Sequence, residues 1–147
     1  GLLEQHARRF DAARARFEQG ARASPNSAPI LQAWARLEAS QNNQPAARDL
    51  FQRATEADPS HAPSWQAWGV FESRCGNATL ARELFRHALR AEPCNAQAYQ
   101  AWALLEESEN NFERARDLFQ KGVDACPGHK PVWQAWALME ARASVAE

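Results

Sequence analysis

The sequence has a strict 34-residue period, and this period restricts the possible folds more than any other feature of the chain. Aromatic, proline, acidic and basic residues all recur at the same step, without insertions. The recurring positions include Trp34, Trp68, Trp102 and Trp136; Phe17, Phe51, Phe85 and Phe119; and Pro25, Pro59, Pro93 and Pro127. A period of this length is typical of solenoids, in which each unit buries its apolar face against its neighbours.

Each unit contains two amphipathic segments with helical spacing. Residues 62–75 place their aromatic side chains on one helix face, and residues 79–91 form a second apolar stripe. Between them, Gly76-Asn77 stops the first helix, because glycine suits a left-handed position and asparagine suits an N-cap. Pro93 ends the second. No segment alternates apolar and polar residues, so we predict an all-α fold, a right-handed α-solenoid of 34-residue helix–turn–helix repeats.

The period also sets the expected boundaries. Helix A of each unit is expected at residues 28–41, 62–75, 96–109 and 130–142, and helix B at residues 11–23, 45–57, 79–91 and 113–125. The chain is then one domain, residues 1–147, made of a partial repeat 1–27, full repeats 28–61, 62–95 and 96–129, and a partial repeat 130–147. Residues 1–9 are expected to be the tail of an earlier helix A. Because neither end shows a polar capping helix, we expect a piece of a longer solenoid.

Composition and charge argue against several classes of protein. The formal net charge is −1, from 17 Lys and Arg against 18 Asp and Glu, which disfavours a strongly cationic nucleic-acid sleeve. No apolar run approaches the roughly 20 residues that a membrane-spanning helix needs, so no membrane span is expected. Cys75, Cys94 and Cys126 are odd in number and lack CxxC spacing, which suggests neither a disulfide framework nor a zinc site.

The sequence contains no catalytic motif. Its four histidines, His6, His61, His87 and His129, fall in different units and in different kinds of element. We therefore predict no enzyme: no catalytic residues, no metal, no cofactor and no small-molecule substrate.

One string of residues resembles a known repeat family. The string is Trp65-x-x-Trp68-x-x-Phe71-Glu72, then Gly76-Asn77, Ala81-Arg82-x-x-Phe85 and Pro93, and it resembles the half-a-tetratricopeptide (HAT) repeat. A 34-residue helix–turn–helix step is the tetratricopeptide period, but a standard tetratricopeptide repeat has an aromatic residue where this chain has Glu72. HAT repeats occur almost entirely in RNA-processing proteins, so the resemblance implies a role of that kind.

The pairing of Gln-Ala-Trp-Ala with an Ala-Arg-x-Leu-Phe helix is most similar to the chloroplast HAT proteins of plants and green algae. This resemblance implies a module of the chloroplast stroma that binds single-stranded messenger RNA, such as photosystem II transcripts. It would stabilise or process the RNA by blocking exonucleases and RNA structure. The alternative is a protein–protein scaffold of a nuclear splicing or 3′-end cleavage complex. Protein partners, or self-association through the solenoid ends or groove, also stay open.

A glutamate on helix A and an arginine on helix B recur ten residues apart. We interpret them as structural ion pairs across the seam between the two helices, because a buried carboxylate needs a cation and hydrogen bonds to stay charged. The expected pairs are Glu38–Arg48, Glu72–Arg82 and Glu106–Arg116, with Glu4–Arg14 as the N-terminal copy.

The candidate RNA contacts lie on the A helices, which a right-handed solenoid presents on its concave face. The glutamine two residues before each repeat tryptophan offers a donor and an acceptor to a base edge, and a glutamine ladder between A helices is the alternative. Arginines at variable positions offer contacts to phosphates or bases. The candidates are Gln32, Arg36, Gln66, Arg74, Gln100, Gln134 and Arg142. Most repeat aromatics are expected in the core, with Trp65, Tyr99 and Trp133 between units.

Overall fold

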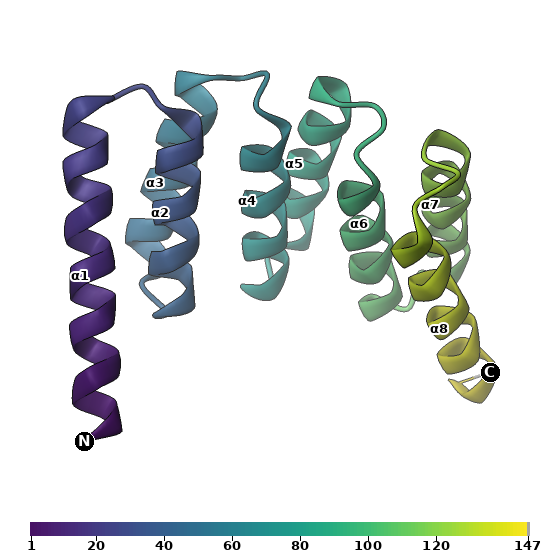
Figure 1. The fold of residues 1–147 in the computed structure, drawn as a ribbon. Helices are drawn as coiled ribbons and strands as arrows, with labels where there is room; N and C mark the ends of the chain where they lie inside the picture. The colour runs from purple at the N-terminus through teal and green to yellow at the C-terminus, as the bar shows by residue number, and fades with distance from the viewer. Residues whose placement is uncertain (147) are drawn as a thin grey trace. The chain divides into compact units, whose positions relative to one another are not determined.

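The computed structural model describes residues 1–146, and within that range it contains eight α-helices and no strand (Figure 1). They are α1 (Leu2–Ala23), α2 (Ala28–Ser40), α3 (Gln44–Ala57), α4 (Ala62–Arg74), α5 (Ala78–Ala91), α6 (Ala96–Ser108), α7 (Phe112–Ala125) and α8 (Lys130–Ala146). From α2 to α7, each bound falls within one residue of the expected one. The prediction of an all-α array of helix–turn–helix repeats is confirmed.

By its internal contacts the chain divides into two compact units, Gly1–Ala67 and Trp68–Glu147. The boundary falls inside α4, so the first unit holds α1 to α3 and the start of α4. The second unit holds the rest of α4 together with α5 to α8. None of the helices described is both long enough and apolar enough to cross a membrane.

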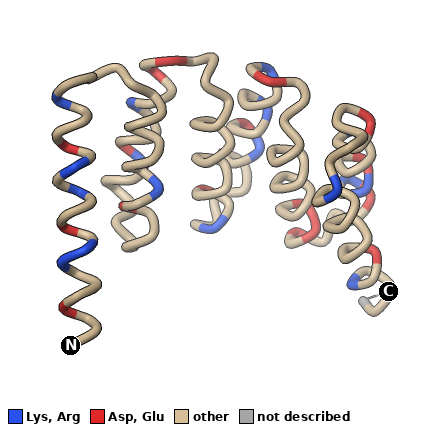
Figure 2. Tube along the Cα trace, in the orientation of Figure 1, with Lys and Arg blue, Asp and Glu red and all other residues tan. Residues whose placement is uncertain are grey.

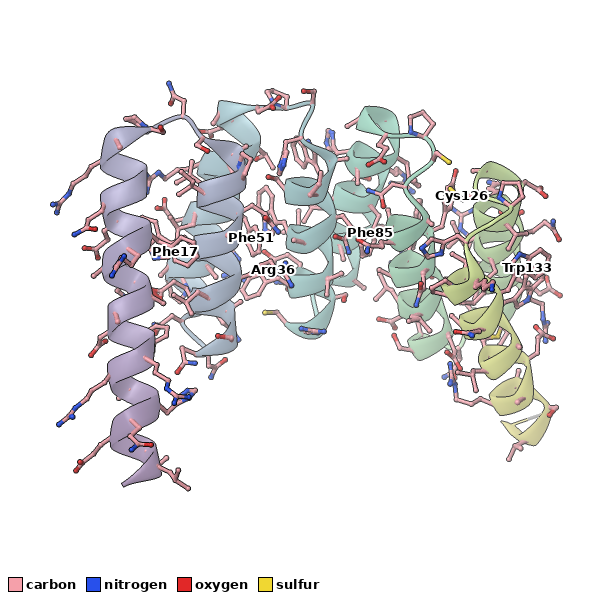
Figure 3. The ribbon with its side chains drawn as sticks, in the orientation of Figure 1. Phe17, Arg36, Phe51, Phe85, Cys126 and Trp133 are labelled. Atoms are coloured by element: carbon pink, nitrogen blue, oxygen red, sulfur yellow. The ribbon has the colours of Figure 1, made fainter. Side chains whose placement is uncertain are left out.

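In the first unit, α2 contacts both α1 and α3. Small side chains allow these helices to approach closely: Ala35, Ala47 and Ala54 are fully buried, and Phe51 fills the space beside them. Phe17 lies on the side of α1 that faces α2 (Figure 3), but it is only partly buried. The core of this unit therefore centres on the α2–α3 pair.

In the second unit, α6 contacts α5, α7 and α8. Phe85 of α5 is fully buried, and its ring stacks on Trp102 of α6 with the centroids 6.3 Å apart. Phe85 also lies against Gly69 of α4, where a Cβ atom would come within 2.7 Å of the ring. Phe85 thus joins its own helix pair to the first helix of the next repeat. Phe119 stacks on Trp136 of α8 in the same way, at 6.1 Å.

Residues in the left-handed conformation end three of the A helices. Asn42, Gly76 and Asn110 have φ angles of 60°, 86° and 62°, a conformation that glycine and asparagine adopt more readily than other residues. The sequence had predicted this role for Gly76.

The first helix departs from the expected pattern. Arg8 and Arg9 stand one repeat before the turn residues Asn42 and Asn43, and arginine favours the interior of a helix. Residues 1–9 therefore do not form a separate helix A tail but continue into α1. In the same way α8 runs to Ala146 instead of ending at 142, because no asparagine or glycine follows at the turn position.

Candidate functional site

Glu106 is the centre of a buried hydrogen-bond network in the second unit, with 2% of its surface exposed. Arg82 donates from Nε to Oε2 at 2.8 Å and from Nη2 to Oε1 at 3.1 Å. Trp102 Nε1 donates to Oε2 and Asn111 Nδ2 donates to Oε1, both at 3.0 Å. These four hydrogen bonds keep charged a carboxylate that burial alone would neutralise.

Glu38 and Glu72 occupy the same place in their repeats and are also buried. Arg14 donates to Glu38 from Nε and Nη2, at 2.8 and 3.0 Å. Trp68 Nε1 donates to Glu72 at 3.0 Å. The buried glutamate of each full repeat is therefore a structural group whose carboxylate accepts hydrogen bonds from side chains of the same chain.

An asparagine five residues after each of these glutamates ties it to the turn. Its Nδ2 donates to the carboxylate, and its backbone N–H donates to the carbonyl of the same glutamate, which is the 6→1 bond of a Schellman turn. The side-chain and backbone distances are 3.1 and 2.9 Å for Asn43–Glu38, 2.8 and 2.9 Å for Asn77–Glu72, and 3.0 and 2.8 Å for Asn111–Glu106. Because these asparagine side chains bind the glutamate of the preceding helix, they form no N-cap hydrogen bond to the helix that follows.

The arginine partners differ from the predicted ones. The spacing in the sequence predicts that each glutamate pairs with the arginine ten residues later, as in Glu38–Arg48, Glu72–Arg82 and Glu106–Arg116. The structure instead pairs an arginine with the glutamate 24 positions later, as in Arg14–Glu38, Arg82–Glu106 and Arg116–Glu140. The arginine on helix B points toward the A helix of the next repeat. The expected Glu4–Arg14 pair is also wrong, since Glu4 is exposed and lies 3.6 Å from the N-terminal amine.

The hydrogen bonds lower the pKa values of the buried glutamates. Burial alone would raise the pKa of Glu106, but donation from Arg82, Asn111 and Trp102 outweighs it and lowers this pKa from 4.5 to about 2. The pKa of Glu38 is lowered as well, because Arg14 and Asn43 outweigh the effect of burial. A carboxylate whose pKa is lower in the folded chain stabilises the fold above the unfolded-state pKa, and this contribution is lost as the pH falls through the folded value.

We therefore expect an acid-dependent difference between the wild-type chain and the isosteric Glu106→Gln variant. At pH 7 the ionised carboxylate contributes roughly 3 kcal/mol to the free energy of unfolding. The gap between the two proteins should shrink as the pH falls from about 4.5 toward 2, where wild-type Glu106 becomes protonated. Urea unfolding at a series of pH values measures this difference in the free energy of unfolding. A difference that stays constant with pH would contradict the lowered pKa of Glu106.

The predicted RNA-binding residues lie on the A helices, and their environments differ. Gln32, Gln66 and Gln100 are partly buried and Gln134 is exposed. Among the described residues of each unit, no hydrogen bond joins Gln32 to Gln66 or Gln100 to Gln134. Arg36 (Figure 3) and Arg74 are exposed. Basic and acidic residues are interspersed along α1 in Figure 2.

Arg142 forms an ion pair with an acidic side chain of the same unit. Its Nε and Nη2 each donate to a carboxylate oxygen of Glu107, at 2.7 Å. The two residues come from α8 and α6 and are 35 positions apart, one more than the repeat period, and this spacing is visible in the sequence. A bidentate pair of this kind neutralises the arginine and makes it a poor candidate for a phosphate contact.

The second unit also exposes apolar side chains on α6 and α8. Leu104 on α6 is 37% exposed and Leu138 on α8 is 59% exposed, and both stand two residues after a repeat tryptophan. An open hollow of about 410 Å³ lies beside Leu104. Its other lining residues are Glu107, Ser108, Asn110, Phe112 and Arg142. An exposed leucine in a hollow whose lining pairs Glu107 with Arg142 suits a partly apolar ligand better than a polyanion.

The aromatic side chains are mainly structural. Trp102 is buried, and Trp34, Trp68 and Trp136 are partly buried. Trp133 was expected to pack between units, but it is 49% exposed. It lies at the start of α8 (Figure 3), where it stacks on Trp136 with the centroids 5.9 Å apart.

Comparison with known proteins agrees with this architecture. Two family models described as tetratricopeptide repeat match the chain, over residues 1–62 and 96–139. The helix pairs, their turns and these matches define an array of helix–turn–helix repeats. The two matched segments are therefore similar to tetratricopeptide repeats, and proteins with these repeats are generally non-enzymatic scaffolds. No curated protein matches the sequence.

Solved structures share the fold at low sequence identity. A crystal structure of MamA has a TM-score of 0.74 and 17% identity, with 97% of this chain and 83% of that chain covered. PilF of Pseudomonas aeruginosa has a TM-score of 0.78 and 16% identity, with 98% and 66% covered. The first tetratricopeptide repeat domain of Spaghetti (RPAP3), bound to the HSP90 peptide SRMEEVD, has a TM-score of 0.69 and 14% identity, with 80% and 96% covered.

Proposed function

We propose that the chain is a non-enzymatic interaction module whose second unit binds a peptide segment of a partner protein along α6 and α8. The observation that carries the proposal is the exposure of Leu104, which lines the open hollow of the second unit, together with that of Leu138 on α8, the helix that supplies Arg142 to the same lining. Fully burying an apolar side chain contributes about 1.5–3 kcal/mol, so contacts to both leucines would supply a large part of the binding energy of a short segment. The peptide-bound structure of Spaghetti (RPAP3) shows that this fold can hold a peptide.

The chemistry of the surface specifies the kind of segment. Glu107 neutralises Arg142, and Ser108 and Asn110 offer neutral hydrogen-bonding groups at the rim of the hollow. A strongly acidic peptide would find no unpaired cation in the lining of this hollow. We therefore expect a segment with one or two apolar anchor residues and little net charge.

Binding of single-stranded messenger RNA is the second candidate function, with the chloroplast stroma as its location and the HAT family as its affiliation. The observation that favours it is the exposure of Arg36 and Arg74, which form no ion pair within residues 1–146. Arginine offers both phosphate contacts and base stacking. The net charge of −1 predicts a weak, salt-dependent interaction for this chain.

The test presents the chain with a displayed library of random peptides and, in parallel, with a random pool of single-stranded RNA. We expect selected peptides with apolar anchors whose dissociation constants rise at least about tenfold in Leu104→Asp and Leu138→Asp. Leu80→Asp is the matched control, because Leu80 is 38% exposed but lies on α5 and is not among the residues that line the hollow.

The same experiment can overturn the peptide proposal. Preferential binding of the RNA pool, weakened by salt and by Arg36→Ala and Arg74→Ala but not by Leu138→Asp, would favour the RNA-binding function. Selected peptides that bind all three leucine variants equally well would place the binding surface elsewhere on the chain.

A further inference from the structure

Two cysteines from different turns meet in the second unit. Cys94 lies in the turn between α5 and α6, and Cys126 is the residue that follows α7, before α8 begins. Their sulfur atoms are 2.8 Å apart. The label in Figure 3 marks Cys126 at this turn, and both residues are free thiols.

The surrounding contacts hold the two thiols face to face. Cys94 Sγ donates to the carbonyl of Ala125 at 2.9 Å, and Cys126 Sγ donates to the carbonyl of Cys94 at 2.8 Å. A disulfide bond is about 2.05 Å long, so the sulfurs need to approach by less than about 1 Å. The two turns are already positioned for a covalent link.

The repeat shows that this pair is particular to one place in the chain. The equivalent positions one repeat earlier carry Ser60 and Glu92, and those two repeats earlier carry Asn26 and Asp58. The corresponding turns of the other repeats are therefore polar. Cys126 packs against the hydrophobic core of the second unit, but Cys94 is exposed, so core packing does not account for the cysteine at position 94.

We propose that Cys94 and Cys126 form a reversible disulfide, by exchange with a small-molecule disulfide such as oxidised glutathione, and that this bond links the turns before α6 and α8. The proposal does not depend on the peptide-binding function. Both helices that it would restrain begin directly after the bonded turns, so the link would fix the spacing between two successive A helices.

The exchange takes two steps. Cys94 is exposed and meets the oxidant first, whereas burial raises the pKa of the Cys126 thiol to about 11. The Cys94 thiolate attacks one sulfur of the small disulfide and releases one thiol. Cys126 then loses its proton and attacks Cys94 Sγ, displacing the second small thiol. Two protein thiols are oxidised, one small disulfide is reduced to two thiols, and both protons leave on those thiols.

The test equilibrates the chain with mixtures of reduced and oxidised glutathione, in a Cys75→Ser background so that one thiol pair remains. Gln41 and Glu109 stand at the positions equivalent to Cys75, so a polar residue is tolerated there. We expect the loss of two hydrogens by mass spectrometry and a cross-linked peptide pair containing Cys94 and Cys126. The oxidised chain should melt at a temperature at least about 5 °C higher than the reduced chain.

Two single variants make the outcome decisive. In Cys126→Ser, exchange stops at the first step, so one glutathione should remain attached to Cys94. In Cys94→Ser, the less accessible Cys126 should react much more slowly. Retention of both thiols under oxidising conditions would overturn the proposal, and so would a disulfide that links two chains, visible as a dimer on a non-reducing gel.

Discussion

Replacing Glu106 with alanine should lower the free energy of unfolding by about 3–5 kcal/mol, the range found when one partner of a buried ion pair is removed. The substitution leaves the Arg82 guanidinium, Trp102 Nε1 and Asn111 Nδ2 without their shared acceptor. It also separates the end of α6 from its turn and from α5. Urea unfolding followed by circular dichroism measures the loss.

Glu140→Ala is the matched control, because Glu140 occupies the same phase of the repeat. Its side chain is 45% exposed, and it accepts a hydrogen bond from Arg116 Nε at 2.6 Å. Exposed ion pairs contribute about 0–1 kcal/mol, so this variant should remain close to wild type. Equal losses in the two variants would mean that burial and the shared acceptor have no special role at Glu106.

Phe85→Ala should have an effect of similar size, about 3–5 kcal/mol, because it removes a fully buried ring and leaves a cavity. The cavity would open between Gly69 on one side and Trp102 on the other. We expect a lower denaturation midpoint by urea titration and a change in tryptophan fluorescence as Trp102 loses its stacking partner.

Phe112→Ala provides the comparison with the same residue type. Phe112 begins α7 and is only partly buried, so its removal should cost less than half as much. If Phe112→Ala were the more damaging change, the aromatic stripe on helix B would not be the main link between repeats.

The helix pairs could be predicted from the sequence because two patterns agree in every unit. The 34-residue period and the helical spacing of apolar residues assign the same buried face to each helix. The error at α1 also has a local cause. The period assigned a turn to a site where Arg8 and Arg9 stand, although neither residue favours a turn. Local residue chemistry was the better guide there than the repeat phase.

The arginine partners could not be chosen from the period alone. Arg82 lies ten positions after Glu72 and 24 positions before Glu106, and both spacings recur in every repeat. Which glutamate receives the arginine depends on how successive helix pairs stack. The contacts of the asparagines are easier to predict from the sequence. Glu106 and Asn111 are only five residues apart, and they lie on either side of a turn that the sequence already indicates.

The binding face was the least predictable part of the molecule. Arg142 was selected as a phosphate contact because it is basic and lies at a variable position. Its pairing with Glu107 depends on the distance between α6 and α8, which no local pattern encodes. The exposure of Leu104 and Leu138 could not be predicted either, because their position in the repeat does not indicate whether a neighbouring helix covers them.

Arg14, Arg82 and Arg116 each pair with a glutamate of the next repeat, and this affects how such a chain can change in length. The observed pairs join one repeat to the next at a constant spacing of 24 positions. An in-frame duplication or deletion of one whole repeat therefore recreates an equivalent pair at the new junction. Gene rearrangement can therefore lengthen or shorten the array without leaving a buried glutamate unpaired with an arginine.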